Sequence, residues 1–296
     1  MSATRYLSVK STVSITPGFS REHVQIPYYG VSTPFNAVLN RVGKEVCKTA
    51  KSKALNISTI STPSTYMARK NKLRKFAEIL AFPNVYECYS VQHPVLVGAG
   101  MEPVDLKGRW QEQHFKNNNP ITLELACGGG EYTVGLARLF PERNFIGVDV
   151  KGNRLHAGAK DALEQGLHNA AFLRTRIEII EHFFAAGEVA EIWITFCDPF
   201  PRAIKENRRL TSPYFHEKFR QILQKDGLIH LKHDDDGFVK FSLQTIASDP
   251  RCQLLLQNLD IYANMLPMPE LSIQTLYETK HLAAGKTIKY LRYLIG

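Results

Sequence analysis

The sequence predicts an α/β fold with a mostly parallel sheet and helices on both of its faces. From Ile121 onward, short apolar runs alternate with segments that have helical periodicity. Such alternation implies parallel strands joined by right-handed crossovers. The last two apolar runs are separated by a long loop instead, which favours an antiparallel edge at the C-terminal end of the chain.

Seven strands and four helices account for this prediction. The strands are expected at residues 121–125, 145–148, 171–173, 192–196, 228–232, 253–261 and 287–294. The helices are expected at residues 131–140, 154–165, 177–184 and 213–223. The second helix is amphipathic, because Leu155, Ala159, Ala162 and Leu163 fall on one side of it.

Residues 1–66 differ in composition from the rest of the chain. They hold eight Lys or Arg against two acidic residues, Glu22 and Glu45, and are rich in Ser and Thr. We expect a disordered basic extension, whose composition also fits an organellar transit peptide or sequence upstream of a start at Met67. Residues 67–115 are expected to form a basic segment that packs on or flanks the main domain, residues 116–296.

Composition excludes several classes of protein. No apolar run approaches the roughly 18 residues of a membrane-spanning helix. The five cysteines form no CxxC pair, which argues against a zinc site or a disulfide framework and fits a reducing compartment. No metal is predicted, because the three consecutive acids Asp234, Asp235 and Asp236 cannot all face one ion. We expect a cytoplasmic protein, or an organellar one if residues 1–66 are a transit peptide.

A glycine-rich loop joins the first strand to the first helix of the main domain. Gly128, Gly129 and Gly130 follow Glu124, and Asp149 ends the second strand nineteen residues after the last glycine. Successive glycines let a ligand approach the backbone closely, and an acid at the end of the second strand can accept hydrogen bonds from the ribose of an adenosine cofactor.

NAD and S-adenosylmethionine both carry such a ribose. Two features favour S-adenosylmethionine: the extra acid Glu124, and Thr133 at the position where a dinucleotide fingerprint has its third small residue. S-adenosylmethionine is a cation without a pyrophosphate, so carboxylates near it are favourable, whereas beside a pyrophosphate they would be repulsive. The loop therefore predicts a methyl donor.

A carboxylate and a basic segment follow the fourth predicted strand. Asp198 begins the sequence Asp-Pro-Phe-Pro, and four cations come next, at Arg202, Lys205, Arg208 and Arg209. Open α/β sheets bind ligands beyond the carboxyl ends of their strands, and a basic segment beside such a site suits the phosphates of a nucleic acid. Together they indicate an enzyme that modifies a nucleotide within a nucleic acid.

These residues resemble the bacterial tRNA (guanine-N7-)-methyltransferases, which act on the variable-loop guanine. The resemblance runs from about Asn71 to the C-terminus. Most of its weight lies at residues 123–131, 145–152, 192–211 and 272–278. It implies a Rossmann-like class I methyltransferase fold, with a mostly parallel seven-stranded sheet, in residues 116–296. It also implies S-adenosylmethionine as cofactor, tRNA as partner and methylation at guanine N7, conventionally nucleotide 46.

Site residues follow from this resemblance position by position. Glu124, Gly128, Gly130 and Asp149 match positions around the cofactor, and Asp198 matches both a cofactor-site residue and the catalytic aspartate. The substrate-binding positions correspond to Arg202, Lys205, Arg208, Arg209, Asp234, Thr275, Tyr277 and Glu278. The family's bacterial members imply no obligate protein partner, so a monomer or homodimer is expected.

The chain departs from the family's usual pattern at five positions: Gly129, Arg176, Cys197, Arg202 and His233. Arg176 stands where many members have an acid near the adenine, and we assign it no cofactor role. Arg202 replaces a lysine and keeps its charge but not its geometry. Two alternatives stay open: a catalytically weakened RNA-binding homologue, and a methyltransferase that acts on another RNA or on a small molecule.

Overall fold

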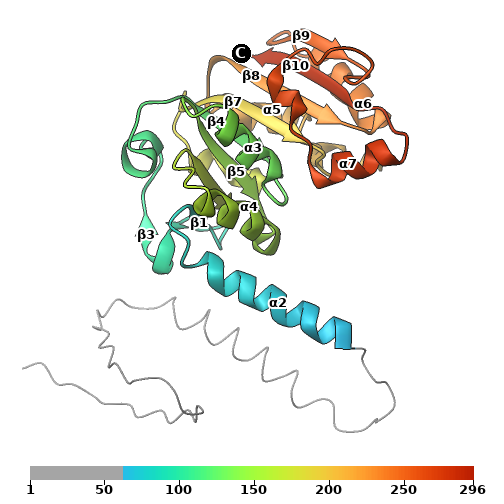
Figure 1. Cartoon of the computed structure of the whole chain (residues 1–296). Helices are drawn as coiled ribbons and strands as arrows, with labels where there is room; N and C mark the ends of the chain where they lie inside the picture. Colours follow the sequence, from blue (N-terminus) through green and yellow to red (C-terminus); the bar gives the residue numbers. More distant parts are fainter. Residues whose placement is uncertain (1–62) are drawn as a thin grey trace, which may run out of the picture. The chain divides into compact units, whose positions relative to one another are not determined.

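A single ten-stranded sheet organises the computed structural model, which describes residues 63–296 (Figure 1). The strand order is β3-β2-β1-β6-β5-β4-β7-β8-β10-β9. Residues 1–62 of the expected disordered extension lie outside the described residues, and its last four residues, 63–66, are instead the start of helix α2. All seven predicted strands are present, and the prediction of a seven-stranded sheet is corrected to ten by three short N-terminal strands.

The elements succeed one another as follows. The strands are β1 (Val85–Glu87), β2 (Leu96–Val97), β3 (Pro103–Val104), β4 (Ile121–Leu125), β5 (Asn144–Asp149), β6 (Ala170–Arg174), β7 (Val189–Thr195), β8 (Leu223–His233), β9 (Cys252–Asn258) and β10 (Lys289–Ile295). The α-helices are α2 (Pro63–Ile79), α3 (Glu131–Leu139), α4 (Gly152–Glu164), α5 (Pro213–Arg220), α6 (Asp236–Ser248) and α7 (Leu276–Ala283). Shorter helical turns are η1 (Ala99–Met101), η2 (Trp110–Phe115), η3 (Ile177–His182), η4 (Ala203–Arg208) and η5 (Pro269–Ser272).

The parallel part of the sheet is centred on β4, whose five residues are all buried. β4 pairs in parallel with β5 on one side and with β7 on the other. The chain runs from β4 through β5 to β6, and then returns to β7 across β4. The carboxyl ends of β4 and β7 are thus the topological switch point, where open α/β sheets bind their ligands.

The antiparallel edge is present as predicted. β10 pairs antiparallel with β8 from Lys289↔His233 to Ile295↔Gly227, and β9 pairs antiparallel with β10. At the other edge, β1 adds to β6 in parallel, and β2 and β3 follow in antiparallel pairs. These strands have only two or three residues, too few for a period of two to be visible in the sequence.

Two of the four predicted helices end or form differently. The segment 177–184 forms a short 3₁₀ turn, η3, because Ile179 has non-helical backbone angles (φ −123°, ψ 23°). The helix predicted at 213–223 ends at Arg220, and Leu223 already pairs with β7. The long loop expected before β10 contains η5 and α7. None of the helices in residues 63–296 is both long and apolar enough to cross a lipid bilayer.

Alternation along the strands gives the sheet a buried cluster on each face. On β7, Ile192 and Ile194 join the cluster covered by α5 and α6, whereas Trp193 joins the one covered by α3, α4 and α7. Trp193 is fully buried and stacks on His230 of β8, with ring centroids 4.1 Å apart. The loops at the strand ends are thereby fixed from both sides.

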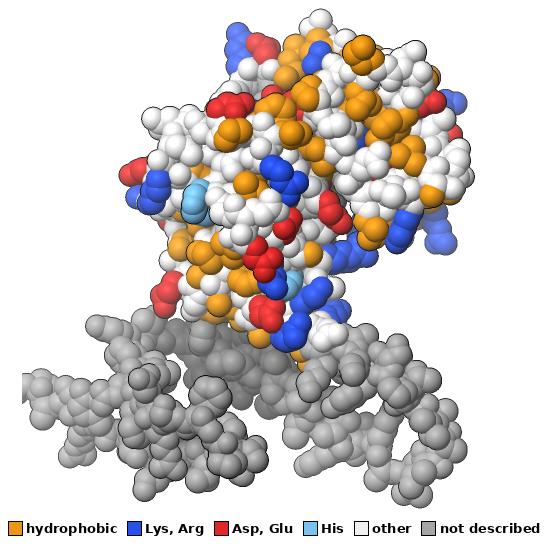
Figure 2. Space-filling view, viewed as in Figure 1, with side chains coloured by type: hydrophobic (Ala, Val, Ile, Leu, Met, Phe, Trp, Pro, Cys, Tyr) orange, Lys and Arg blue, Asp and Glu red, His pale blue; other side chains and the backbone are white. Residues whose placement is uncertain are grey.

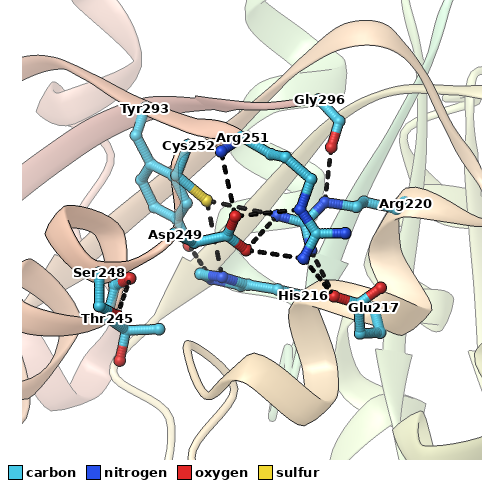
Figure 3. A network of polar contacts seen from close by, with 10 residues as sticks. All are labelled: His216, Glu217, Arg220, Thr245, Ser248, Asp249, Arg251, Cys252, Tyr293 and Gly296. Carbon is cyan, nitrogen blue, oxygen red and sulfur yellow. Dashed lines mark hydrogen bonds and ion pairs between the residues drawn. The ribbon is translucent and has the colours of Figure 1, made fainter.

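A polar network ties the end of α5 to the turn between α6 and β9 (Figure 3). The Asp249 carboxylate accepts hydrogen bonds from Arg220 at 2.6 Å and from Arg251 at 3.0 Å. Arg220 also donates to the carbonyl of Gly296, next to the end of β10. Because one carboxylate holds two guanidinium groups from separate segments, the network fixes the C-terminal edge of the sheet.

Candidate active site

A pocket of about 870 Å³ opens at the carboxyl ends of β4, β5, β7 and β8. α7 and the turn after it close one side of the pocket. Its walls hold these predicted site residues: Gly128, Asp149, Asp198, Arg208, Asp234, Thr275 and Tyr277. Residues from eight segments of the sequence therefore meet at the switch point, in a volume typical of ligand sites.

Asp149 holds the glycine loop in place. Its Oδ2 accepts a hydrogen bond from the Gly128 amide at 3.0 Å, and its Oδ1 accepts one from the Lys151 amide at 2.7 Å. Each oxygen keeps a second lone pair, which the hydroxyl groups of a ribose could occupy. Gly130 has φ +78°, and a Cβ there would lie 2.6 Å from the Phe172 ring, so this turn requires glycine.

Glu124 lies beneath the loop and not on the pocket wall. Its Oε2 accepts hydrogen bonds from the amide and hydroxyl groups of Thr133, and its Oε1 accepts one from the Thr195 hydroxyl at 2.7 Å. The carboxyl group therefore joins the end of β7 to the start of α3. Burial raises its pKa to about 7, although the Thr133 and Thr195 hydrogen bonds act in the opposite direction.

Replacing Glu124 by glutamine is expected to change how stability depends on pH. A raised pKa in the folded state means that the stabilising contribution is complete below about pH 4.5 and is lost as pH rises through about 7. Glu124→Gln should therefore gain about 3 kcal/mol relative to the wild type between pH 4.5 and pH 8. Urea unfolding at both pH values measures this difference.

The control for this experiment is Glu102→Gln, at an exposed position outside the pocket. The Glu102 variant should follow the wild type at both pH values. A Glu124→Gln curve that runs parallel to the wild-type curve from pH 4.5 to pH 8 would show that this carboxyl group does not titrate in the folded protein.

The residues around Asp149 fit S-adenosylmethionine. Thr175, just after β6, lines the pocket, and its buried Oγ1 has no hydrogen-bond partner within residues 63–296. A Cβ at Gly128 would meet no atom within 4 Å, so the loop leaves open space above it. An unpartnered buried hydroxyl and an open glycine loop beside the carboxylate at the end of β5 suit an adenosine cofactor.

The guanidinium group of Arg176 forms an ion pair with a neighbouring acid, Glu178. Its guanidinium Nη2 lies 3.2 Å from Glu178 Oε1, and both side chains line the pocket. An acid is thus present near the predicted adenine position, two residues after the place where the family usually has one. Because Arg176 stands where many family members have an acid, the Glu178 carboxylate in this part of the pocket wall is paired with a cation.

Three residues on the pocket wall have left-handed backbone conformations. Ala126 follows β4 with φ +60°, Phe196 follows β7 with φ +46°, and Phe200 has φ +43°. For a phenylalanine this conformation costs roughly 1–2 kcal/mol. Backbone strain of this kind is common at functional sites, where the surrounding structure holds a loop in one conformation. Here all three residues flank the switch point.

Asp198 is exposed at the mouth of the pocket, directly beyond β7. Its Oδ1 accepts a hydrogen bond from the Phe200 amide at 3.1 Å, which closes a tight turn and orients the carboxylate. The residue is exposed and lines the pocket, so the carboxylate is accessible to a ligand. The predicted catalytic acid is therefore both oriented and accessible.

The four predicted cations have different environments. Arg208 lines the pocket with its guanidinium 4.7 Å from the Phe200 ring centroid, whereas Arg202 and Lys205 lie on the same segment outside the pocket. Arg209 is buried, and its guanidinium donates hydrogen bonds to the Pro199 and Phe200 carbonyls. It also stacks on Phe241 at 4.3 Å. Arg209 thus supports the loop from inside, and its predicted contact with substrate is not available in this arrangement.

The charge on the body is mixed in sign. Residues 67–296 hold 29 Lys or Arg and 26 Asp or Glu. On the face shown in Figure 2, basic and acidic side chains are interspersed. The segment with Arg202, Lys205 and Arg208 is therefore a local concentration of positive charge beside the pocket, as the sequence predicted.

The three consecutive acids after β8 each have a partner of their own. Asp234 Oδ2 accepts a hydrogen bond from Lys286 at 2.5 Å, Asp235 accepts one from the Phe238 amide and begins α6, and Asp236 pairs with Lys289 at 2.7 Å. Burial acts to raise the pKa of Asp234, but the hydrogen bond and the charge of Lys286 act in the opposite direction, and the pKa is lowered.

The segment around α7 is fixed by a buried ion pair. Lys232 Nζ lies 2.8 Å from Glu278 Oε1, and both side chains are 0% exposed. Lys232 also donates to the Leu271 and Ile273 carbonyls, each at 2.9 Å. Burial lowers the pKa of Lys232, and the Glu278 charge opposes that effect. Glu278, predicted to bind substrate, lies off the pocket wall and instead positions the helix that carries Tyr277.

Thr275 and Tyr277 occupy the wall as predicted. Thr275 is the N-cap of α7, and its hydroxyl accepts a hydrogen bond from the Glu278 amide at 3.1 Å. Tyr277 is half-exposed and lines the pocket. The Thr275 hydroxyl accepts a hydrogen bond at the helix start and keeps its own hydrogen to donate, whereas Tyr277 is the more exposed of the two residues.

Cys127 and Cys197 also line the pocket and are buried. Burial raises the pKa of both thiols, well above the ordinary value. They are therefore protonated at neutral pH, which argues against a nucleophilic role. Away from the pocket, His216, Asp249 and Cys252 gather within 4.8 Å of one another (Figure 3). Asp249 already carries two guanidinium partners, so the charge of this cluster is balanced without an ion.

Comparison with known proteins assigns the family. Residues 118–291 match a family described as "Putative methyltransferase". The chain is 48% identical over 227 residues to a tRNA (guanine-N(7)-)-methyltransferase of Bacteroides thetaiotaomicron, covering 76% of this chain and 85% of that relative. The chain belongs to the tRNA (guanine-N(7)-)-methyltransferase family.

A second family member agrees with this assignment, and one solved structure shares the fold. A family member from Christiangramia forsetii is 45% identical over 230 residues, covering 77% of this chain and 100% of that relative. The crystal structure of the 16S rRNA methyltransferase KamB has a TM-score of 0.50 at 13% identity, covering 67% of this chain and 97% of that chain. The Rossmann-like class I methyltransferase fold is therefore confirmed.

Among the polar pocket residues that sequence reasoning missed, two lie next to Asp234. His281 and Lys286 line the pocket next to Asp234, with His281 Nδ1 at 3.4 Å from Asp234 Oδ2. They come from α7 and the turn after it, a segment that the sequence predicted as loop. The available signal was Gly285, a residue typical of helix C-termini, which has φ +74° here.

Proposed function

We propose that this chain transfers a methyl group from S-adenosylmethionine to N7 of the variable-loop guanine of tRNA, conventionally nucleotide 46. The observation that carries the proposal is the convergence of Asp149, Asp198 and Asp234 on one pocket beside the exposed cation Arg208. One acid suits the cofactor ribose, two suit the hydrogen-bonding edge of a guanine, and the cation suits a phosphate.

Methyl transfer to guanine N7 requires no proton transfer by the protein. Guanine N7 carries a lone pair and no hydrogen, so the site needs no general base. S-adenosylmethionine, when bound, supplies the electrophilic methyl group. Asp198 would accept hydrogen bonds from the guanine N1–H and N2 amino groups, which orients N7 and stabilises the positive charge that the base gains. The strained, hydrogen-bonded turn at Phe200 supports this role because it holds Asp198 in one orientation.

Glu124 and Glu278 act in this proposal as positioning residues. Glu124 fixes the start of α3 against the end of β7, and Glu278 fixes α7 against β8. We further propose that the protein acts in the cytoplasm without an obligate partner subunit, as a monomer or homodimer.

The direct test is transfer of a labelled methyl group. The full-length chain is incubated with radiolabelled-methyl S-adenosylmethionine and tRNA that lacks N7-methylguanine, and the product is digested to nucleosides. We expect label in N7-methylguanosine from the variable loop. Label in another nucleoside, or in a small molecule with tRNA left unmodified, would favour the alternative substrates. Cofactor and tRNA binding without transfer would favour a catalytically weakened homologue.

The basic segment is expected to make tRNA binding depend steeply on salt. Each phosphate contact contributes about 0.7 to 0.9 to the slope of log Kd against log salt concentration. Replacing Arg202, Lys205 and Arg208 together by alanine should therefore flatten the slope by roughly 2 to 3. Filter binding at several salt concentrations measures it.

The matched control is Lys225→Ala. Lys225 is exposed near the start of β8, which lies at the end of the sheet opposite the carboxyl ends of the parallel strands. Its removal should leave the slope unchanged. An unchanged slope in the triple variant would show that the phosphates are held elsewhere.

A further inference from the structure

Lys286 is fixed next to a carboxylate that the proposed reaction needs. The turn after α7 passes through Gly285 in a left-handed conformation, and the Lys286 amide donates to the His281 carbonyl at 3.0 Å. The Lys286 ammonium then reaches Asp234 Oδ2 at 2.5 Å. The side chain of Lys286 is 50% exposed, whereas that of Asp234 is 7% exposed.

The other charged neighbours of Asp234 do not neutralise its carboxylate in the same way. His233 Nδ1 accepts a hydrogen bond from the Asp235 amide, and its Nε2 donates to the Cys197 carbonyl, so this imidazole is neutral. Lys289 donates to the main-chain carbonyl of Asp234 and pairs with Asp236. His281 lies farther away, at 3.4 Å. Lys286 is therefore the main counter-ion of this carboxylate.

The pair is suited to exchange. The Lys286 ammonium group is the exposed member of the pair, so an incoming phosphate can reach it and replace the carboxylate as its partner. In the proposed complex Asp198 accepts the N1–H and one hydrogen of the N2 amino group, so the second N2 hydrogen is the donor left for Asp234. While Lys286 pairs with Asp234 Oδ2, the negative charge that attracts this donor is neutralised. Every guanine in an RNA brings its own phosphate, and a lysine binds phosphate as a mobile point charge.

We propose that Lys286 is a displaceable counter-ion, which neutralises Asp234 in the free protein and moves to a tRNA phosphate next to the target guanine when substrate binds. Its departure restores the full negative charge of Asp234 toward the guanine N2 amino group. Two successive uses of one lysine thus couple phosphate binding to base recognition. This inference rests on the proposed function, because it requires a guanine within an RNA as the ligand.

The test compares Lys286→Met with Lys286→Arg and with Lys280→Met, which removes an exposed lysine of α7 outside the pocket. Unmodified tRNA is the probe, and both Kd and steady-state kinetics are measured over a range of salt concentrations. Lys286→Met should raise Kd and KM roughly 3- to 10-fold at low salt and flatten the salt slope by about 0.7 to 0.9. kcat should stay within about twofold, and Lys286→Arg should keep the wild-type slope.

Three results would overturn the inference. An unchanged salt slope in Lys286→Met would mean that Lys286 makes no phosphate contact. Tighter tRNA binding by this variant would mean that Lys286 only blocks Asp234. An equal effect of Lys280→Met would mean that the change reflects net charge. If the wild-type protein forms no N7-methylguanosine, both the proposed function and this inference are wrong. If the wild type methylates normally but Lys286→Met keeps the wild-type salt slope, only the inference is wrong.

Discussion

Replacing Asp198 by alanine is expected to lower the rate of methyl transfer at least about a hundredfold, which corresponds to roughly 2.7 kcal/mol of lost transition-state stabilisation. The carboxylate is exposed at the pocket mouth and is oriented by the Phe200 amide. Its charge is most useful when the purine becomes cationic, so its loss should reduce kcat more than binding. Single-turnover transfer at saturating S-adenosylmethionine measures this.

Two comparisons separate chemistry from binding in this experiment. The Kd of Asp198→Ala for tRNA should stay within about threefold of the wild type, because the phosphate contacts are made by other residues. Asp198→Asn keeps the shape and one acceptor but loses the charge, so it should also be severely impaired. A parallel loss of tRNA binding and transfer would make Asp198 a binding residue and not a catalytic one.

Replacing Lys232 by methionine is expected to destabilise the fold by about 3 to 5 kcal/mol. The change leaves the Glu278 carboxylate fully buried with Tyr262 as its remaining hydrogen-bond donor at 2.8 Å, and frees the Leu271 and Ile273 carbonyls. An uncompensated buried charge costs more than the ion pair contributed. Urea unfolding at constant pH measures the loss.

The double variant Lys232→Met with Glu278→Leu provides the control. Removing both charges at once replaces a buried ion pair by apolar side chains, which is often neutral for stability, so most of the loss should be recovered. Lys280→Met, on the exposed face of α7, should change stability by less than about 0.5 kcal/mol. A double variant as unstable as the single one would show that Lys232 contributes through its carbonyl contacts and not through its charge.

The parallel sheet could be predicted because each of its main strands is a continuous apolar run. The strand Ile121–Leu125 is buried on both faces, and such strands are visible without any knowledge of their neighbours. The three N-terminal strands could not be predicted, since Leu96–Val97 and Pro103–Val104 are too short to show a period. β1, which joins these two strands to the rest of the sheet, pairs with β6, far away in the sequence.

The site was predicted where a residue's chemistry alone indicates its place. Asp149 and Asp198 end apolar runs, so their position at the strand ends follows from the sequence. The sequence did not show which of two neighbouring residues lines the pocket and which is buried. Arg208 faces the pocket and Arg209 the interior, and Glu278 is buried whereas Tyr277 is half-exposed. These differences depend on helical turns of four to eight residues, whose orientation is set by contacts distant in sequence.

The inward guanidinium of Arg209 has a consequence for how substrate preference can diverge within such a protein. It holds the Pro199 and Phe200 carbonyls, and thereby keeps the loop of Asp198 in one shape regardless of which side chains project from the neighbouring segment. Arg202, Lys205 and Arg208 can therefore be exchanged one at a time for residues that suit a different RNA, while the carboxylate stays in place. Arg209 itself cannot be exchanged in this way, although in the sequence it looks like one more cation of the basic segment.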